Sequence, residues 1–371
     1  MLKANDVVIA AMDLLSAYGA GVDACWEGLM EGRHAFSCVR RFQNEKFHSL
    51  LAGTVPEGLL DPQKPLPEQF LDYLSKCASL FPEDALLMLA STLGEIERLE
   101  NPEGRCTSDS LLEKALKRFG KKRGMVVSAA CASSNSAIAR AGAMIRAGRL
   151  DYALIAGCDY VSEFVFSGFA TLRAMAEAPS RPYDQNRTGL ILGDSAGILG
   201  LTSAQKAQEN GWDVLAKISG WGMTCDAVHI TAPMESGEML AEAAWKALAQ
   251  ADLKAEDIGA VIGHGTGTKY NDDMEINALN ILYKGLPKKP LISVKGGCGH
   301  TLAGAGIVQA AVAVKMLQTG LIPPQTSLET PGEGAEEMLS KEVRRLSVPR
   351  ILTMNSGFGG LNAVLILEEA K

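Results

Sequence analysis

The chain has 371 residues, of which 47% are apolar and 21% are charged, and its formal net charge is −7. This length is enough for a large core in one or two domains, and the composition is typical of a soluble globular protein. The acidic balance disfavours a general nucleic-acid-binding protein, which needs a positive surface.

Cysteine spacing and hydropathy indicate the compartment. The eight cysteines form no CxxC pair, which argues against a structural zinc site. The first residues lack the basic, apolar and small-residue regions of a secretory signal. No apolar run reaches the ~18–20 residues that span a bilayer. We therefore expect a cytoplasmic protein with free thiols and no membrane span.

Short runs rich in Val, Ile and Leu alternate with segments of helical periodicity. Strands are predicted at residues 124–130, 152–157, 258–263, 291–295 and 363–367. Helices are predicted at residues 134–147, 237–251, 272–283 and 304–319. This alternation predicts an α/β fold in which most strands are buried.

Two predicted strand-to-helix junctions resemble each other. Cys131 lies at the first and His300 at the second, and small residues follow each of them before a long apolar helix. We interpret this as an internal duplication with a period of about 170 residues, the separation of 131 and 300. The two halves could then face each other and bring Cys131 and His300 together. Chance similarity is the alternative, because strand–turn–helix units are common in α/β proteins.

Cys131 lies among small residues, in Ser-Ala-Ala-Cys-Ala-Ser-Ser-Asn-Ser at 128–136. The helix that follows would point its N-terminal N–H groups and positive dipole end at the sulfur, which favours the thiolate. A thiolate there is a nucleophile suited to thioester exchange. Taken alone, the segment also fits a buried structural cysteine. We interpret the other seven cysteines as packing residues, although Cys298 lies only two residues before His300.

Two of the five histidines, His264 and His300, lie in glycine-rich segments where a substrate could approach imidazole and backbone. A lone histidine in such a segment also fits a polar residue with satisfied hydrogen bonds. Two of them, together with Cys131, favour a catalytic group. The remaining histidines lack this setting: His34, His48 and His229.

Other residues near these segments could assist. The hydroxyls of Thr266 and Thr268 fit either ligand binding or simple turn chemistry. Lys295 is either a surface lysine or a charge that keeps the histidines neutral. The glycine-rich segment at 355–362 is either a plain loop or a source of N–H groups for an oxyanion hole.

Together these segments resemble the elongating type of β-ketoacyl-acyl carrier protein synthase, of the thiolase superfamily. The matching segments span almost the whole chain in the family's order: AACASSN at 129–135, SRPYDQNRTGLILGDSAG at 180–197, CDAVHITAP at 225–233, GHGTGTKYNDDME at 263–275, SVKGGCGHTLAGAG at 293–306 and NSGFGGLNA at 355–363. The resemblance implies a thiolase-like α/β fold of two duplicated halves in a layered αβαβα arrangement. The halves would be residues 1–205, with the nucleophile, and 206–371, with both catalytic histidines.

By motif position, the resemblance implies that Cys131 carries the acyl group and that His264 and His300 promote decarboxylation of the extender thioester. It assigns Lys295 to the family's lysine near the second histidine. Further positions match supporting roles: Phe358 in the oxyanion hole and acyl gate, Thr266 and Thr268 at the phosphopantetheine arm, and Arg173 at the carrier-protein entrance.

The implied reaction is a decarboxylative Claisen condensation of an acyl thioester with malonyl-acyl carrier protein, in fatty acid or polyketide elongation. No metal or redox cofactor is needed, and phosphopantetheine arrives on the carrier protein. The implied partners are an acyl carrier protein and a second chain, in a homodimer or in a heterodimer with a related ketosynthase. The alternatives are a synthase-fold acyltransferase and a non-catalytic or chain-length-determining partner, although such partners lack the nucleophile.

The sequence departs from the family at several positions. Gln309 stands where a Glu commonly partners the lysine, and Ser356 replaces a common Phe. The region 84–124 looks shortened, which affects the expected chain length and substrate more than the chemistry. The run at 117–123 is either a basic docking surface for an acidic carrier protein or a solvated charged face.

Overall fold

The elements of the N-terminal half begin with a long strand and alternate between strands and helices. The computed structural model describes residues 2–43, 46–96 and 108–370. In chain order the elements are β1 (Val7–Ser16), β2 (Gly19–Ala20), α1 (Val22–Met30), β3 (Ser37–Cys38), β4 (Leu51–Gly53), η1 (Glu57–Leu59), α2 (Leu66–Ala78), β5 (Leu86–Ala90), α4 (Ser108–Phe119), β6 (Arg123–Val127), α5 (Ser133–Arg146), β7 (Tyr152–Asp159), α6 (Glu163–Thr171), β8 (Leu192–Gly193), β9 (Ser195–Ser203) and α7 (Ala204–Glu209).

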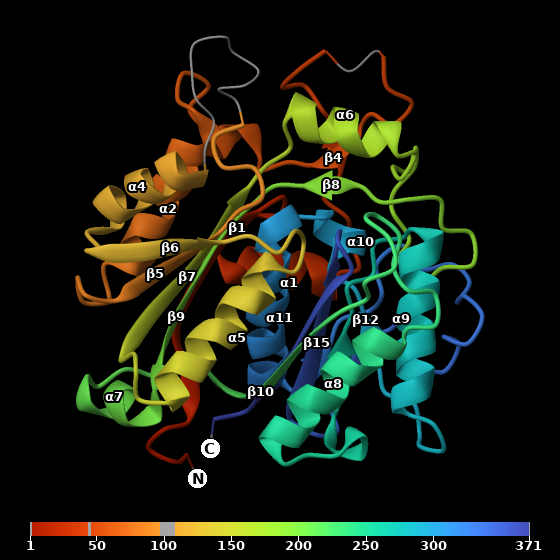
Figure 1. The fold of residues 1–371 in the computed structure, drawn as a ribbon. Coiled ribbons are helices and arrows are strands. Elements are labelled where there is room, and N and C mark those ends of the chain that lie inside the picture. Colours follow the sequence, from red (N-terminus) through yellow and green to blue (C-terminus); the bar gives the residue numbers. More distant parts are fainter. Residues whose placement is uncertain (1, 44–45, 97–107, 371) are drawn as a thin grey trace.

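The C-terminal half repeats this alternation. Its elements are β10 (Ala216–Cys225), α8 (Glu238–Ala251), η2 (Ala255–Asp257), β11 (Ala260–Ile262), α9 (Lys269–Leu282), β12 (Leu291–Ile292), α10 (Lys295–Cys298), η3 (Leu302–Gly304), α11 (Ala305–Thr319), β13 (Leu321–Ile322), β14 (Arg344–Arg345), β15 (Arg350–Gly357) and β16 (Leu361–Glu368). The two termini lie close together at one end of the molecule (Figure 1).

The two halves have the same sheet topology. The strand order is β6-β5-β7-β9-β1 in the first half and β12-β11-β15-β16-β10 in the second. The last strand in chain order of each half, β9 or β16, is antiparallel to both of its neighbours. The halves join through antiparallel pairing of β1 with β10. This equivalence confirms the predicted duplication. The division at residues 205 and 206 remains our proposal, and that position lies within α7.

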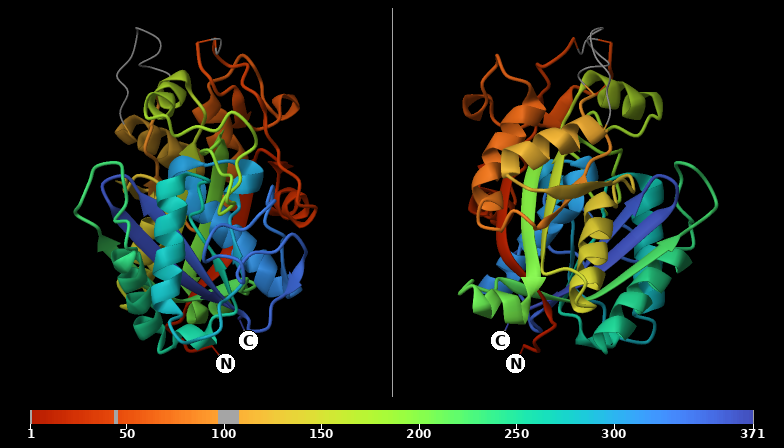
Figure 2. Two further views of the ribbon diagram at one scale, coloured as in Figure 1. Left: turned by 90° about the vertical axis from the view of Figure 1, so that its right-hand side faces the viewer. Right: turned by 60° about the vertical axis from the view of Figure 1, so that its left-hand side comes forward.

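Helices cover the sheets in layers (Figures 1 and 2). α5 and α11 contact each other and strands of both halves, so they form the middle layer. α2 and α4 cover the outer face of the first sheet, whereas α8 and α9 cover that of the second. The predicted αβαβα arrangement is therefore confirmed.

The middle helix α11 is apolar nearly all round because sheets pack on both sides of it. In α11 almost every residue is buried, and Ile307, Val308 and Val312 belong to the largest core cluster. The stretch Leu302–Thr319 is long and apolar enough to cross a membrane, contrary to expectation, but 83% of it is buried inside the protein. Its hydropathy therefore reflects its place in the core.

Strand lengths differ from those predicted at the two junctions. β6 ends at Val127 and β12 at Ile292, earlier than the predicted 130 and 295. Lys295 therefore lies in the helical turn α10 instead of on a strand. The run after β12 continues past the last ladder bond because residues 293–295 are buried, whereas residues 128–130 after β6 are exposed or half-buried.

Candidate active site

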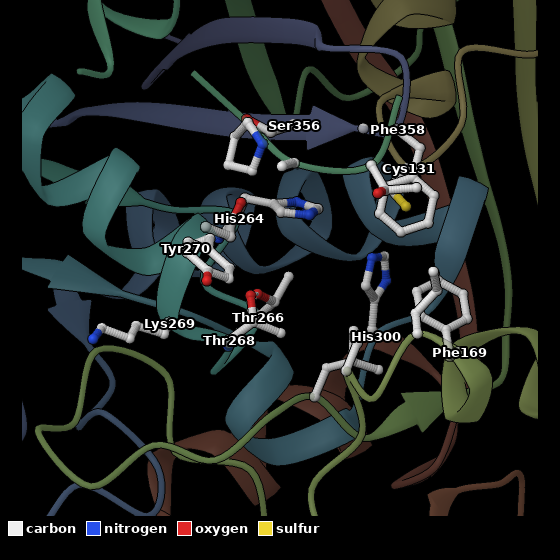
Figure 3. Close-up of a pocket in the computed structure, with 18 of the residues that line it drawn as sticks. Cys131, Phe169, His264, Thr266, Thr268, Lys269, Tyr270, His300, Ser356 and Phe358 are labelled. Atoms are coloured by element: carbon white, nitrogen blue, oxygen red, sulfur yellow. Dashed lines mark hydrogen bonds between the residues drawn. The ribbon is translucent and has the colours of Figure 1, made fainter. Parts of the chain in front are cut away.

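A cavity of about 390 Å³ opens where the two halves meet, beyond the carboxyl ends of β6 and β11 (Figure 3). Side chains from both halves line it. The predicted site residues in its wall are Cys131, Arg173, His264, Thr266, Thr268, His300 and Phe358. The structure thus brings together residues that are far apart in the sequence. Lys295 is buried beside His264.

Cys131 lies in a sharp turn between β6 and α5. The residue before it, Ala130, has a left-handed backbone with φ 48°, which is uncommon for a residue other than glycine. The turn is fixed from within, because the Ser133 hydroxyl accepts from Ala129 N and donates to Ala130 O. The thiol sits next to Phe358 in the cavity (Figure 3).

Burial keeps the Cys131 thiol protonated. Burial raises its pKa to about 12, with a smaller rise from Asp159, while Lys295 lowers it. A helix N-terminus contributes roughly 0.3–1 kcal/mol, less than one pKa unit, whereas burial shifts a pKa by up to about 3–5 units. The helix end favours the thiolate as expected, but burial outweighs it, so Cys131 is a thiol in the resting protein.

His300 occupies the equivalent turn of the second half. Two residues on, Leu302 also has a left-handed backbone, with φ 52°, and its N–H donates to Nδ1 of His300 at 3.0 Å. Because Nδ1 is an acceptor, a neutral His300 carries its proton on Nε2. The backbone of His300 bonds to the N-terminal half. Its N–H donates to Ile191 O at 2.7 Å, and its carbonyl accepts from Gly193 N at 2.9 Å.

Ala303 joins the two turns. Its N–H donates to Asp159 Oδ2 at 3.0 Å, and its carbonyl accepts from the Ser134 hydroxyl at the start of α5. The buried Asp159 carboxylate also accepts from Ser91 Oγ and from the N–H and hydroxyl of Thr92. These bonds fix the turn of Cys131 against that of His300.

His264 follows β11 in a loop that two carboxylates of α9 organise. Glu275 accepts from the backbone N–H groups of His264 and Gly265, and Asp272 accepts from those of Thr266 and Gly267. Gly267 has φ 79°, and a Cβ there would lie 2.4 Å from Ser180 Oγ. Only glycine fits at position 267. The loop holds His264 and the two threonines, Thr266 and Thr268, towards the cavity.

The His264 ring is oriented by donors at its Nδ1. Lys295 Nζ and Asn355 Nδ2 each lie 3.3 Å from it, so the ring proton is on Nε2, as in His300. The two imidazoles are 5.2 Å apart and nearly perpendicular. Burial, followed by the charge of Lys295, holds the pKa of each well below its usual range. Both histidines are therefore neutral Nε2–H donors at neutral pH.

Lys295 is buried and makes no ion pair in the described part of the chain. Burial lowers its pKa to about 8, although Glu275 raises it. The amide nitrogen of Gln309 donates to Gly263 O at 2.6 Å and to Met354 O at 3.2 Å. Its amide oxygen accepts no hydrogen bond from Lys295. Gln309 therefore does not take the place of the Glu that commonly partners this lysine. Because Lys295 is buried, its interpretation as a surface residue is wrong.

Phe358 lies in the turn between β15 and β16, against the nucleophile. A Cβ on Gly357 would lie 3.1 Å from Cys131 N, so the backbones of the two turns are in close contact. The Phe358 ring stacks on Phe169 of α6 at 5.6 Å, and Phe169 contacts His300 at 6.4 Å. This stack forms one side of the cavity above the thiol (Figure 3).

The remaining cavity wall is more polar. The hydroxyls of Thr266 and Thr268 are 2.8 Å apart, and Arg173 is exposed at the rim. Ser356 donates to Asn362 Oδ1 at 2.8 Å, and Asn362 donates to Asp226 at 2.6 Å. A serine therefore leaves a polar wall where the family commonly has an aromatic ring.

The basic run at 117–123 lies away from this cavity. It precedes β6, whose opposite end leads to Cys131, a separation of roughly 16 Å along five strand residues. Several of its charges are also engaged within the N-terminal half. Arg118 pairs with Asp72, Lys122 with Glu83 at 2.8 Å, and buried Lys121 donates to Phe81 O at 2.8 Å. The structure thus favours a charged structural face over docking at the cavity.

The prediction that the other seven cysteines are packing residues holds for only some of them. Cys25, Cys77, Cys158 and Cys298 are buried packing residues, but Cys38 and Cys225 are exposed, so that prediction is wrong for these two. Cys106 and part of the region 84–124 lie outside the described residues. Among the residues that are described, no group of three or more His, Cys, Asp or Glu side chains could hold a metal ion.

Several functional residues were missed from the sequence. Glu275 and Asp272 are spaced i and i+3 on the helix after His264, a signal for two carboxylates on one helical face. Asn355 directly precedes Ser356 in a segment already considered for the oxyanion hole. Asp159 and Phe169 carried no local signal, because only the packing of the halves brings them to the site.

Family models match both halves of the chain. The β-ketoacyl synthase N-terminal domain matches residues 123–207 and the C-terminal domain matches residues 215–329. The chain belongs to the β-ketoacyl synthase family. Its fold is accordingly the thiolase-like fold of the ketosynthases.

Curated relatives include synthases named for acyl carrier protein substrates. Chloroplastic 3-oxoacyl-[acyl-carrier-protein] synthase II of Arabidopsis thaliana is 33% identical over 254 residues, 66% of this chain and 47% of that protein. 3-Oxoacyl-[acyl-carrier-protein] synthase 2 of Vibrio cholerae is 27% identical over 412 residues, 98% of each chain. Among solved structures, the ishigamide ketosynthase/chain length factor has a TM-score of 0.90 at 26% identity, with both chains fully covered.

Proposed function

We propose that this ketosynthase is an elongating β-ketoacyl-acyl carrier protein synthase that condenses an acyl thioester with malonyl-acyl carrier protein. The observation that carries the proposal is a buried cysteine in one half that shares a cavity with two neutral Nε2–H donors from the other. The relatives are named for an acyl-carrier-protein product, which supports the proposal that both thioesters arrive on a carrier protein.

In the first step the Cys131 sulfur attacks the acyl thioester carbonyl. The carrier's phosphopantetheine thiol leaves and takes up the proton that Cys131 loses, so the bond energy of a thioester is retained. Backbone N–H groups of Cys131 and Phe358 would stabilise the tetrahedral oxyanion, since their turns are in contact. Thr266 and Thr268 would hold the phosphopantetheine arm in the mouth of the cavity.

In the second step malonyl-carrier thioester loses CO2, and the electron pair of the broken bond forms an enolate. Its oxygen would accept hydrogen bonds from Nε2–H of His264 and His300, which face the same cavity. Removing one such donor typically costs on the order of 10²–10³ in rate. The enolate carbon then attacks the acyl carbonyl on Cys131, and collapse of the intermediate expels the thiolate and gives the β-ketoacyl thioester.

The carrier protein would approach over the rim of the cavity. Arg173, which follows α6, and Lys269, at the start of α9, are exposed there. Carrier proteins are expected to be acidic, and rim charges chiefly affect the association rate. We further propose a cytoplasmic location and a dimer, either of two such chains or with a related ketosynthase.

Charge reversal tests this docking surface. Arg173→Glu and Lys269→Glu should each weaken binding of acyl carrier protein several-fold, most strongly at low salt, as measured by fluorescence anisotropy. Lys117→Glu is the matched control, because Lys117 is an exposed lysine on α4 away from the cavity. Equal weakening by all three variants would contradict docking at the rim.

Intact-protein mass spectrometry tests the reaction itself. Mixing with an acyl-carrier protein should add one acyl group, which Cys131→Ala abolishes, and malonyl-carrier protein should then release a product two carbons longer. Acylation without chain extension would support the acyltransferase alternative. A chain that is never acylated, and whose Cys131→Ala variant leaves the output of a partner ketosynthase unchanged, would be a non-catalytic partner.

A further inference from the structure

Gln309 on α11 connects the two segments that hold His264. Its side chain is fully buried, and its amide nitrogen bonds to the carbonyls of Gly263 and Met354. Gly263 directly precedes His264, and Met354 directly precedes Asn355, whose side chain contacts the His264 ring. Both neighbours are acceptors, so the nitrogen must face them, and a carboxylate could not take the same place.

The amide leaves Lys295 without a charged partner. Lys295 and Gln309 donate to successive carbonyls, those of His264 and Gly263, so both side chains hold the same short segment of backbone. The Gln309 oxygen is buried and has no protein partner among the described residues. A carboxylate at 309 could turn towards the ammonium, whereas the amide contributes no charge.

Lys295 differs from Asn355 in what it does to the imidazole. An ammonium group can only donate, so it requires Nδ1 of His264 to be an acceptor. The Asn355 amide can turn and offer its oxygen, which is buried without a protein partner, and so permits either tautomer. Protonated Lys295 is therefore the group that keeps the Nε2–H donor in the cavity.

The titratable groups around Lys295 come from five helices, turns or loops. Glu275 and Asp272 face it from α9, Cys131 from the turn before α5, Cys298 from α10, and His264 and His300 from their loops. Burial outweighs the carboxylates and lowers the pKa of Lys295 to about 8. The ammonium thus loses its proton under mildly alkaline conditions.

We propose that Gln309 is a positioning residue for the extender step, whose amide fixes His264 and whose neutrality leaves protonated Lys295 to set the His264 tautomer. This inference rests on the proposed decarboxylation of a malonyl thioester. When Lys295 loses its proton, the ring proton can move to Nδ1, and one of the two donors to the enolate disappears. The extender step consequently slows on the alkaline side.

The test measures decarboxylation of malonyl-carrier protein in a Cys131→Ala background, which removes the thiol that lines the cavity. The acetyl-carrier product is followed by mass spectrometry from about pH 6 to about pH 10. The rate should fall above the pKa of Lys295. Gln309→Glu should move this alkaline limb up by about one pH unit or more, because a nearby carboxylate stabilises the ammonium.

Gln309→Met is the matched control, with similar length but neither donor nor charge. It should lower the rate at every pH and leave the alkaline limb in place. A limb that stays in place in Gln309→Glu, or that moves equally in Gln309→Met, overturns the inference.

Lys295→Arg provides a second readout if Gln309→Glu fails to fold, since arginine stays protonated throughout this range. Its alkaline limb should disappear, and a limb unchanged from that of the parent overturns the inference. Absence of decarboxylation by the parent at every pH would instead contradict the proposed function. The two failures are therefore distinguishable.

Discussion

At the scale of single residues, Cys131 experiences opposing influences from its surroundings. The N-terminus of α5 and the ammonium of Lys295 favour the thiolate, whereas burial and Asp159 favour the thiol. Burial dominates. The proton must consequently leave during acyl transfer, when the substrate's leaving thiolate can accept it. A resting thiol also protects the enzyme from alkylation and oxidation, which require the thiolate.

Alkylation measures this balance. Labelling of Cys131 by iodoacetamide should rise about tenfold per pH unit from neutral pH to about pH 10, without a plateau, because the raised pKa lies above this range. Peptide mass spectrometry gives the rate for each cysteine, and the exposed Cys225 serves as the internal control for reagent access. A plateau for Cys131 by about pH 8 would show that the helix end and Lys295 outweigh burial.

At the scale of elements, strained turns position both reactive side chains. Ala130 and Leu302 adopt left-handed backbones at equivalent strand-to-helix junctions of the two halves. Such a conformation costs roughly 1–2 kcal/mol, and the surrounding hydrogen bonds from Ser133, Ser134 and Asp159 compensate for it. The two side chains sit differently relative to these residues, because Ala130 directly precedes Cys131 whereas Leu302 follows His300 by two residues.

The end of α8 offers a comparison outside the site. Asp252 caps this helix with φ 55° and places a negative charge at its C-terminus, both unfavourable. Asp252→Gly should stabilise the protein by about 1 kcal/mol, Asp252→Asn by less, and Asp252→Ala least, since alanine keeps the backbone strain. Urea denaturation measures the order. If Asp252→Ala matched Asp252→Gly, charge alone would explain the gain. Acylation of Cys131 should be unchanged.

At the scale of the whole molecule, burial of the site between two halves links its chemistry to stability. His300 is held neutral, so below the unfolded value of about 6.5 the unfolded chain binds a proton that the folded chain does not. Its contribution to stability is thus lost as pH falls from about 6.5 towards its lowered pKa. Raised pKa values at Glu275, Asp159 and Asp272 act in the opposite direction, because the folded chain then binds protons more readily.

His300→Gln isolates the histidine from these carboxylates. Between about pH 6.5 and about pH 5.5, the free energy of unfolding of the wild type should fall by about 1 kcal/mol relative to this variant. Glutamine can still accept from Leu302 N, so the turn is retained. His229→Gln at an exposed position is the control and should show no such difference. Parallel pH profiles for wild type and His300→Gln would contradict the buried neutral imidazole.

The sequence by itself determined the α/β class and the duplication and singled out Cys131, His264 and His300 as the proposed site residues, because these depend on periodicity and on motifs that are local in the chain. Helix positions were close, as for the predicted 134–147 and the observed Ser133–Arg146. Only the tertiary structure decided the protonation of Cys131 and the tautomers of both histidines. These depend on burial and on partners such as Asn355, Lys295 and Asp159, which lie far from the side chains they control in the sequence. Desolvation is a property of the packed halves, and no local pattern encodes it.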